Sequence, residues 1–374
     1  MSALKQLGEF GQSFWIDFIR RNLVTSGDLQ KLIREDGLKG MTSNPAIFDK
    51  AIRGGEEYTD ALARYVREGV YEPAQLYELL ALEDIRLAAD RLQCVYEETE
   101  ARDGYVSLEV SPHLANDTSA TLLEARRLWR AVARPNLMIK IPGTPAGFPA
   151  VETLTDEGIN VNVTLLFSHE AYANAARAYE RGLSRRAERG DDISRVSSVA
   201  SFFVSRIDSA VDAFLDARAE QASGDQRAEL EAAKGKVAIA WSKIAYRCFK
   251  EVFVENRWRE LLHSGARPQR LLWASTSTKN PNYRDVLYVE ELIGADTVNT
   301  VPPSTIDAFR DHGRVAPTLE QGLDEAKHVL DTVARADISM RQVTDKLLSE
   351  GVKQFVIPYD SLIASIAAAR DDLL

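Results

Sequence analysis

The sequence predicts an α/β fold, and more narrowly a (β/α)8 TIM barrel with additional helical insertions. Short runs of β-branched and aromatic residues recur along the chain, and long stretches with apolar residues three and four positions apart separate them. Eight such runs are present. Strands that alternate with helices are typical of a parallel sheet, and eight repeats of this unit close the sheet into a barrel.

The predicted strands follow one another with helical segments between them. The strand-like runs cover residues 14–19, 38–43, 105–111, 137–142, 159–167, 197–203, 270–276 and 297–301. Helical periodicity is clearest in residues 73–100, 118–133, 169–189 and 205–262. These segments are long enough to return the chain to the start of the next parallel strand.

The chain of 374 residues exceeds the roughly 250 residues that are typical of such a barrel. The strand spacing places the surplus in helical insertions at about 49–102 and 207–265 and in a helical tail after residue 301. We therefore expect residues 1–374 to form one barrel domain with these additions. We expect the charged stretch 225–260 to be a long, solvated helix of the outer ring.

The composition excludes several classes of protein. The chain has 46 Lys and Arg residues against 56 Asp and Glu residues, a net charge of −10 that opposes binding to nucleic acid. Cys94 and Cys248 are too few for a disulfide scaffold, and no segment has the pattern of a signal peptide or a membrane span. We expect a cytoplasmic globular protein, a monomer or a homodimer, that binds anions only through local cations.

Polar residues recur at every second position of several predicted strands. They and their neighbours on the same face are Ser107, Glu109 and Ser111 in the third strand, Asn160, Asn162 and Thr164 in the fifth, Ser201 and Phe203 in the sixth, and Trp273, Ser275 and Ser277 in the seventh. Because alternate residues of a strand share one face, we expect this set to face the barrel interior.

Lys140 interrupts the middle of the apolar run 137–142. A buried ammonium group is unfavourable unless it is paired, and desolvation favours the neutral amine, which is a nucleophile that forms a Schiff base with a carbonyl. Asp17 and Glu109 stand in two other predicted strands. They can move the protons that Schiff-base chemistry requires, and they can also serve as counter-ions for the lysine.

The sequence predicts neither a metal site nor a bound cofactor. The glycine-rich segment 143–147 lacks the Gly-Lys-Ser/Thr ending of a P-loop and the glycine spacing of a dinucleotide site. The histidines lack the spacing of metal ligands; they are His113, His169, His263, His312 and His328.

Four segments resemble the transaldolase family. They are Met-Thr-Ser-Asn-Pro at 41–45, Leu-Met-Ile-Lys-Ile-Pro-Gly-Thr at 137–144, Gly-Ile-Asn-Val-Asn-Val-Thr-Leu-Leu-Phe-Ser at 158–168 and Ala-Ser-Phe-Phe-Val-Ser-Arg-Ile-Asp at 200–208. Together with single residues from Asp17 to about Lys279, the similarity touches seven of the eight predicted strands. The chain looks like the longer bacterial subgroup, without the isomerase domain that is fused to some members.

This resemblance implies a (β/α)8 barrel and a reaction of the non-oxidative pentose phosphate pathway. The family transfers a dihydroxyacetone unit from fructose 6-phosphate or sedoheptulose 7-phosphate to glyceraldehyde 3-phosphate or erythrose 4-phosphate, without a cofactor. The resemblance implies Lys140 as the Schiff-base lysine and Asp17 as the acid and base at the C4 hydroxyl of the donor. It implies Glu109 and Thr164 as the pair that positions a proton-shuttling water.

The resemblance also implies a set of substrate-binding residues. These are Thr42, Asn44, Asn162, Ser201, Phe203, Arg206, Ser275 and Lys279. Asn44, Asn162 and Ser201 match positions that hold the hydroxyls of the dihydroxyacetone unit. Arg206 matches a phosphate-binding arginine at the start of a helix, where amide dipoles also favour an anion.

The sequence departs from the family pattern after the seventh predicted strand. The shorter members carry a Ser-aromatic-Arg arrangement there, whereas this chain reads Ala-Ser-Thr-Ser-Thr-Lys at 274–279. Ser275 matches, but the second arginine of the phosphate site is absent. We expect Lys279 to supply the missing charge, as a point charge in place of a bidentate fork.

The residues also bear on two other functions, a Schiff-base aldolase and a barrel that only binds ligands. The related fructose 6-phosphate aldolases release free dihydroxyacetone, but they are much shorter and carry a tyrosine near the sixth strand, where this chain has Phe202 and Phe203. A barrel that only binds ligands would lack Asp17, Glu109 or Lys140, and all three are present. The residues therefore favour a transaldolase.

Overall fold

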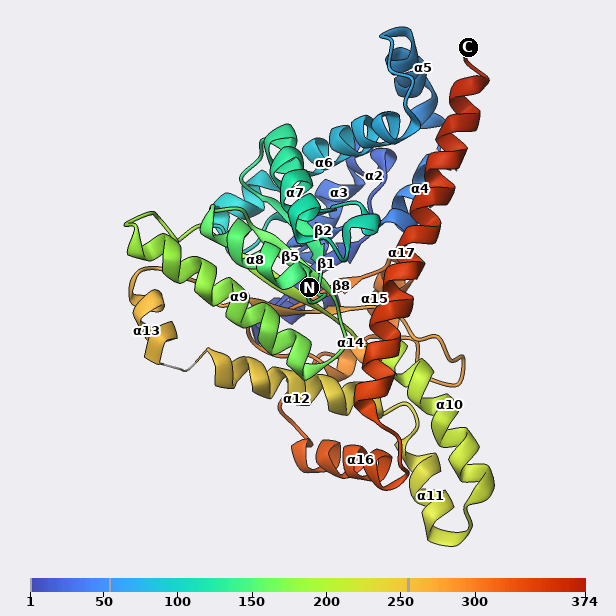
Figure 1. The fold of residues 1–374 in the computed structure, drawn as a ribbon. Coiled ribbons are helices and arrows are strands. Elements are labelled where there is room, and N and C mark those ends of the chain that lie inside the picture. The colour runs from blue at the N-terminus through green and yellow to red at the C-terminus, as the bar shows by residue number, and fades with distance from the viewer. Residues whose placement is uncertain (1, 54, 254–255) are drawn as a thin grey trace.

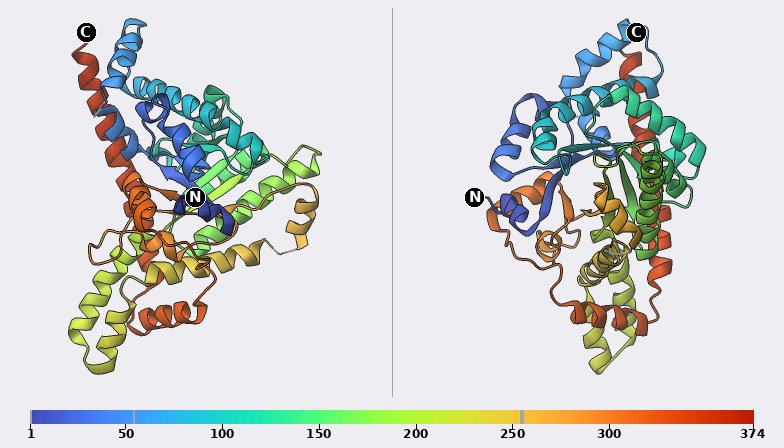
Figure 2. Two further views of the ribbon diagram at one scale, coloured as in Figure 1. Left: turned by 180° about the vertical axis from the view of Figure 1, so that it is seen from behind. Right: turned by 90° about the vertical axis from the view of Figure 1, so that its left-hand side faces the viewer.

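The computed structural model describes residues 2–53, 55–253 and 256–374. Within these ranges eight parallel strands close into a barrel in which each strand is hydrogen-bonded to its neighbours in sequence (Figures 1 and 2). The strands are β1 Gln12–Asp17, β2 Gly40–Thr42, β3 Tyr105–Glu109, β4 Leu137–Pro142, β5 Val161–Leu166, β6 Ser198–Phe203, β7 Arg270–Ala274 and β8 Thr297–Val301. The predicted (β/α)8 fold class is confirmed.

Helices surround the barrel and extend it at both ends. They are α1 Ala3–Gln6, α2 Arg21–Thr25, α3 Asp28–Lys31, α4 Pro45–Arg53, α5 Thr59–Arg67, α6 Pro73–Glu98, α7 Thr118–Val132, α8 Gly147–Asp156, α9 His169–Glu188, α10 Ser205–Gln221, α11 Gly224–Ala233, α12 Val237–Val252, α13 Asn256–His263, α14 Leu287–Glu291, α15 Pro303–His312, α16 Leu323–Arg335 and α17 Met340–Asp371. Short helical turns lie at η1 Leu7–Phe10, η2 Leu32–Asp36, η3 Glu56–Tyr58 and η4 Pro112–Leu114. No helix in the described ranges is long and apolar enough to span a membrane.

The prediction of one long helix over residues 225–260 is wrong. The chain forms α11, α12 and α13 there, and the turn before α12 contains Gly235 with φ of +69°. A Cβ at this glycine would lie 2.7 Å from the ring of Tyr283, so the turn also allows a close contact. One face of α12 is buried against α9 and α16, which makes it a packed helix and not a solvated one.

At the amino-terminal ends of the strands, a network of buried side chains fills the barrel interior. The ring of Trp15 lies opposite Gly40, where an added Cβ would be 2.4 Å from the indole. The indole Nε1 donates to Asp103, which also pairs with Arg270 at 2.9 Å. Because this end is closed, the space for a ligand lies toward the carboxyl ends of the strands.

The predicted interior face of the seventh strand is also wrong. Trp273 pairs in register with Phe202, and the two rings contact each other edge to face at 6.2 Å, on the side of the sheet away from Ser201. The strand ends at Ala274 because Ser275 has φ of +57°, so the alternation does not continue beyond it.

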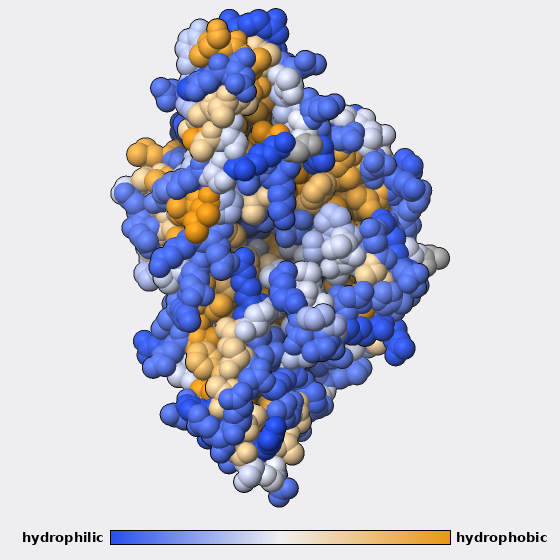
Figure 3. Space-filling model, turned by 90° about the vertical axis from the view of Figure 1, so that its right-hand side faces the viewer, coloured by the Kyte–Doolittle hydropathy of each residue, from blue (hydrophilic) through white to orange (hydrophobic). Residues whose placement is uncertain are grey.

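The last helix, α17, lies across the carboxyl end of the barrel. It packs against α4, η4 and α10, which begin directly after β2, β3 and β6 (Figure 1). Figure 3 looks at the side of the molecule that carries α17, where polar residues cover most of the surface and apolar residues form separate patches. The tail therefore covers the end of the barrel where the predicted site residues gather.

Candidate active site

Lys140 lies inside the barrel and is 4% exposed. Its register neighbours are Glu109 on β3 and Asn162 on β5, which lie at the same level of the barrel. The Nζ atom donates to the backbone carbonyl of Ser43 at 3.0 Å and lies 3.3 Å from Glu109 Oε1. The amine thus has two polar neighbours from two different strand ends.

Two carboxyl groups face this lysine from different strands. Burial raises the pKa of Asp17, while the charge of Lys140 and the hydrogen bond from Thr42 Oγ1 at 2.7 Å oppose the rise. Burial raises the pKa of Glu109 to about 7, although the Lys140 charge again opposes it. Both carboxyls are therefore shifted toward the range in which they can give and take protons near neutral pH.

Thr164 and Glu109 carry buried oxygen atoms without hydrogen-bond partners. Thr164 Oγ1 and both carboxylate oxygens of Glu109 receive no hydrogen bond from any residue that the structure describes, apart from the ion pair of Glu109 with Lys140. Thr164 is two residues beyond Asn162 on β5 and next to Leu165, whose φ of +60° marks an irregularity in the strand. Buried unpaired oxygens of this kind are suited to hold a water or a substrate hydroxyl.

Amide and hydroxyl groups line the interior beside the lysine. Asn162 Nδ2 donates to Ser107 Oγ at 3.0 Å, and Asn162 Oδ1 accepts from Ser201 Oγ at 2.7 Å. Asn44 caps α4, because its Oδ1 accepts from the amide of Ile47 at 3.0 Å. The structure brings Ser107, Asn162 and Ser201 together on one face, as the alternation in the sequence predicted, whereas Asn44 was implied only by the resemblance.

A cationic group lies where β6 and β7 end. Arg206, the second residue of α10, stacks over the ring of Phe203 with 5.2 Å to the ring centroid, and it forms no ion pair or hydrogen bond within the described ranges. Lys279 is exposed, and its Nζ donates to Ser277 Oγ at 2.8 Å. Ser275 holds the two segments together through Ser205, with 2.9 Å between the hydroxyl oxygens.

The two cations influence each other. Although Lys279 is exposed, partial desolvation by the groups around it and the neighbouring Arg206 charge lower its pKa, while Asp17 raises it. Burial lowers the pKa of Arg206, and no acidic residue in the described part of the chain neutralises it. Positive charge without a counter-ion is suited to bind an anion such as a phosphate group.

Comparison with known proteins identifies the family of the chain. The Transaldolase/Fructose-6-phosphate aldolase family matches residues 14–366. The chain belongs to this family. A transaldolase from Trichodesmium erythraeum is 49% identical over 366 residues, which cover 97% of this chain and 96% of that protein. Transaldolases from Thiobacillus denitrificans and Thermobifida fusca are 48% and 45% identical, and the matches cover 98% of this chain and 100% and 98% of those proteins.

Membership of the transaldolase family confirms the resemblance found in the sequence. The alternation of side chains, however, did not reveal two further contacts of Lys140. One is the carbonyl of Ser43, a backbone atom that carries no signal in the side-chain pattern. The other is the ring of Phe355 on α17, whose centroid lies 5.5 Å from Nζ. Phe355 belongs to the tail, and helical periodicity alone shows only that it is buried.

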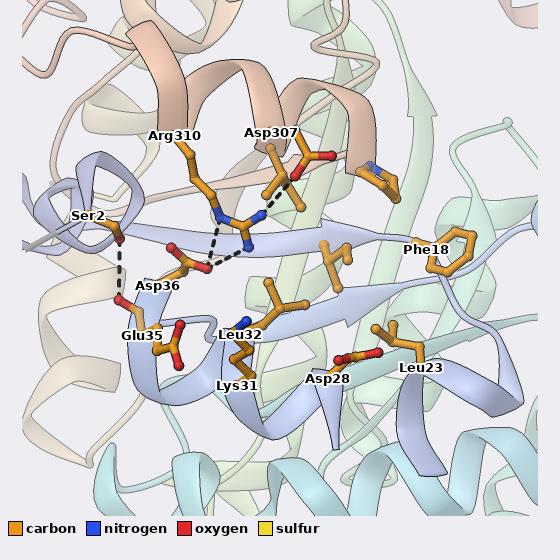
Figure 4. A pocket seen from close by; sticks show the side chains of 13 residues that line it. Ser2, Phe18, Leu23, Asp28, Lys31, Leu32, Glu35, Asp36, Asp307 and Arg310 are labelled. Carbon is orange, nitrogen blue, oxygen red and sulfur yellow. Dashed lines mark hydrogen bonds and ion pairs between the residues drawn. The ribbon is translucent and has the colours of Figure 1, made fainter. Parts of the chain in front are cut away.

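A separate cavity of about 660 Å³ lies outside the barrel, between the segment that contains α2, α3 and η2 and the helix α15 (Figure 4). Its arginine, Arg310, already pairs with Asp36 at 2.6 Å and with Asp307 at 2.8 Å. Asp28 and Glu35 add negative charge and Lys31 adds one positive charge, so acidic residues outnumber basic ones in the lining. This cavity is therefore poorly suited to the anionic substrates of the transaldolase family.

Proposed function

We propose that this chain is a transaldolase, a transferase that moves a dihydroxyacetone unit from fructose 6-phosphate or sedoheptulose 7-phosphate to glyceraldehyde 3-phosphate or erythrose 4-phosphate. The observation that carries the proposal is the buried Lys140 amine between the Ser43 carbonyl and Glu109, in a member of the transaldolase family. No cofactor or metal takes part in the proposed reaction. The cytoplasmic location and the monomeric or homodimeric state stay predictions from the sequence.

Lys140 attacks the ketone carbon of the donor, and loss of water gives an imine. Glu109, with a pKa of about 7, and Thr164 hold the water through which the departing hydroxyl receives its proton. Asp17 then takes the proton of the C4 hydroxyl, the bond between C3 and C4 breaks, and the fragment that begins at C4 leaves as an aldehyde phosphate. The bonding electron pair moves toward the imine and leaves the enamine of dihydroxyacetone on the lysine. The enamine carbon attacks the aldehyde of the acceptor, and hydrolysis of the new imine releases the product.

The remaining site residues bind the substrate in this proposal. Asn44, Asn162 and Ser201 hold the hydroxyls of the dihydroxyacetone unit, which is supported by the hydrogen bond between Asn162 and Ser201 on one face of the interior. Thr42 orients Asp17 through the hydrogen bond to its carboxylate.

The phosphate group binds at the mouth of the barrel. Arg206 is its main partner because this guanidinium has no counter-ion within the described ranges, and Lys279 adds a second positive charge. Ser275 keeps the segment before Lys279 next to the start of α10 through Ser205. Phe203 supports the arginine with its ring face.

The alternative is a Schiff-base aldolase that releases free dihydroxyacetone. The chain has Phe202 and Phe203 in the region near the sixth strand where the short aldolases carry a tyrosine, which favours the transferase. Turnover of fructose 6-phosphate with and without an aldehyde acceptor separates the two, because only the aldolase turns over well without one.

Borohydride reduction in the presence of fructose 6-phosphate tests the covalent step. We expect a dihydroxyacetone-sized adduct on the peptide that contains Lys140, found by peptide mass mapping, and no adduct in Lys140→Arg. An adduct on another lysine, or none in the unchanged protein, overturns the proposed mechanism.

A further inference from the structure

Phe355 closes one side of the space around Lys140. It projects from α17 and is only 6% exposed, with its ring centroid 5.5 Å from the Nζ atom. The other described neighbours of this amine are polar: the Ser43 carbonyl at 3.0 Å and Glu109 at 3.3 Å. The lysine therefore has polar partners on the strand side and an aromatic face toward the tail.

The neighbouring turns of α17 fix the position of this ring. One turn earlier, Gly351 allows close approach, since an added Cβ would lie 3.0 Å from Leu165 Cδ2. One turn later, the ring of Tyr359 packs edge to face against Tyr77 with 5.7 Å between the centroids. Contacts on both sides therefore hold this part of the helix, and the Cα of Phe355 with it, next to the lysine.

A groove borders the part of α17 that precedes this ring. It has a volume of about 990 Å³ and lies between α10 and α17, and Arg206, Lys279, Leu347 and Gln354 are among its lining residues. The two cations in this lining can bind the phosphate of a substrate.

In the proposed function, the enamine on Lys140 has two fates. In transfer, its nucleophilic carbon forms a bond to the aldehyde carbon of the acceptor. In release, that carbon takes a proton from solvent, water adds to the adjacent imine carbon, and the carbon–nitrogen bond breaks to give free dihydroxyacetone and the lysine amine. Because hydrolysis of an imine on Lys140 ends both routes, the step that commits the enamine to release is the protonation of its carbon by solvent, two bonds from Nζ.

We propose that Phe355 is a specificity-determining residue that shields the lysine-bound enamine from solvent and so favours transfer to an acceptor over release of dihydroxyacetone. This inference rests on the proposed function. The ring lies close to Nζ, and the two reacting carbons are one and two bonds away from that atom. In the proposed function the water that the chemistry requires binds to Glu109 and Thr164, whose buried oxygens have no hydrogen-bond partner among the described residues apart from the ion pair of Glu109 with Lys140.

The test compares Phe355→Ala and Phe355→Leu with the unchanged protein. Ile357→Ala is the matched control, because Ile357 lies on the same helix and is 67% exposed. Three rates are measured: transfer from fructose 6-phosphate to erythrose 4-phosphate, appearance of free dihydroxyacetone without an acceptor, and borohydride trapping on Lys140. Thermal unfolding shows that each variant is folded.

We expect the ratio of release to transfer to rise about tenfold in Phe355→Ala, a change that corresponds to about 1.4 kcal/mol in relative barrier height. The rise should be smaller in Phe355→Leu, which keeps more apolar volume, and absent in Ile357→Ala. Trapping on Lys140 should persist in all three.

An unchanged ratio in folded Phe355→Ala overturns the inference, and so does an equal loss of transfer and release, which would mean that the ring only positions the lysine. If Phe355→Ala does not fold, the ratio in Phe355→Leu decides by the same criteria. Failure to trap any adduct in the unchanged protein overturns the proposed function instead, so the two failures are distinguishable.

Discussion

Replacement of Arg206 by alanine should weaken the binding of phosphorylated donors and leave the chemistry on Lys140 largely intact. Within the described ranges Arg206 forms no ion pair, so its removal leaves no carboxylate unpaired and should affect binding more than folding. A charge-assisted hydrogen bond contributes about 1.5–3 kcal/mol, and about 1.4 kcal/mol corresponds to a factor of ten. The KM for fructose 6-phosphate should therefore rise by roughly 10- to 100-fold.

The neighbouring lysine limits this loss. The Arg206 charge is one of the causes that lower the pKa of Lys279, so its removal lets Lys279 hold its proton more firmly and keep its charge for the phosphate. Lys279→Ala should also raise the KM, but by less than Arg206→Ala. The mobile ammonium that it removes binds a phosphate less firmly than the planar guanidinium of Arg206 does.

The assay is steady-state kinetics with fructose 6-phosphate and with an unphosphorylated donor. Arg218→Ala is the matched control, since Arg218 lies on the same helix and lines the same groove but donates to the carbonyl of Ala336 at 2.9 Å. Arg218→Ala and Arg206→Ala each remove one positive charge from the protein. An equal penalty of Arg206→Ala on both donors would refute the reasoning, because the arginine would then support the structure and not the phosphate.

Three further predictions concern the proton relay, the closed end of the barrel and the support of the phosphate site. Because the pKa of Glu109 is raised from 4.5 to about 7, its acid form persists to neutral pH, so imine trapping should slow as the pH rises through about 7. In Glu109→Gln, imine trapping should be slow and should not depend on pH near 7. A pH dependence of trapping like that of the unchanged protein would contradict the role of Glu109 in proton transfer. Asp103→Ala leaves the buried Arg270 unpaired and should lower the free energy of unfolding in urea by about 3–5 kcal/mol, without changing the KM of the folded protein. Tyr283→Phe removes the hydroxyl that donates to Asp212 on α10 at 2.6 Å. The substitution should raise the KM for fructose 6-phosphate by about 2- to 10-fold with kcat retained, because the lost hydrogen bond supports the helix that carries Arg206 and does not contact the phosphate itself. A fall in kcat alone would contradict this.

The barrel and most of its interior could be predicted from local sequence. Alternate residues of a strand share one face of the sheet, so a polar residue at every second position indicates the face that points into the barrel. Glu109 and Asn162 were predicted to face the interior for this reason, and Lys140 was singled out because it interrupts an apolar run; in the structure Lys140 is the register partner of both. Alternation failed at Trp273 because the positive φ of Ser275 ends the strand, and backbone dihedrals of this kind are not visible in a pattern of residue types.

Contacts between distant segments were decided only by the tertiary structure. The sequence by itself determined that residues after 301 are helical and partly apolar, because amphipathic periodicity is a local property. It did not determine that α17 crosses the barrel mouth and brings Phe355 to 5.5 Å from the lysine nitrogen. That placement depends on the packing of Gly351 against Leu165 and of Tyr359 against Tyr77, and the free energy of such packing comes from surfaces that meet only after the chain has folded.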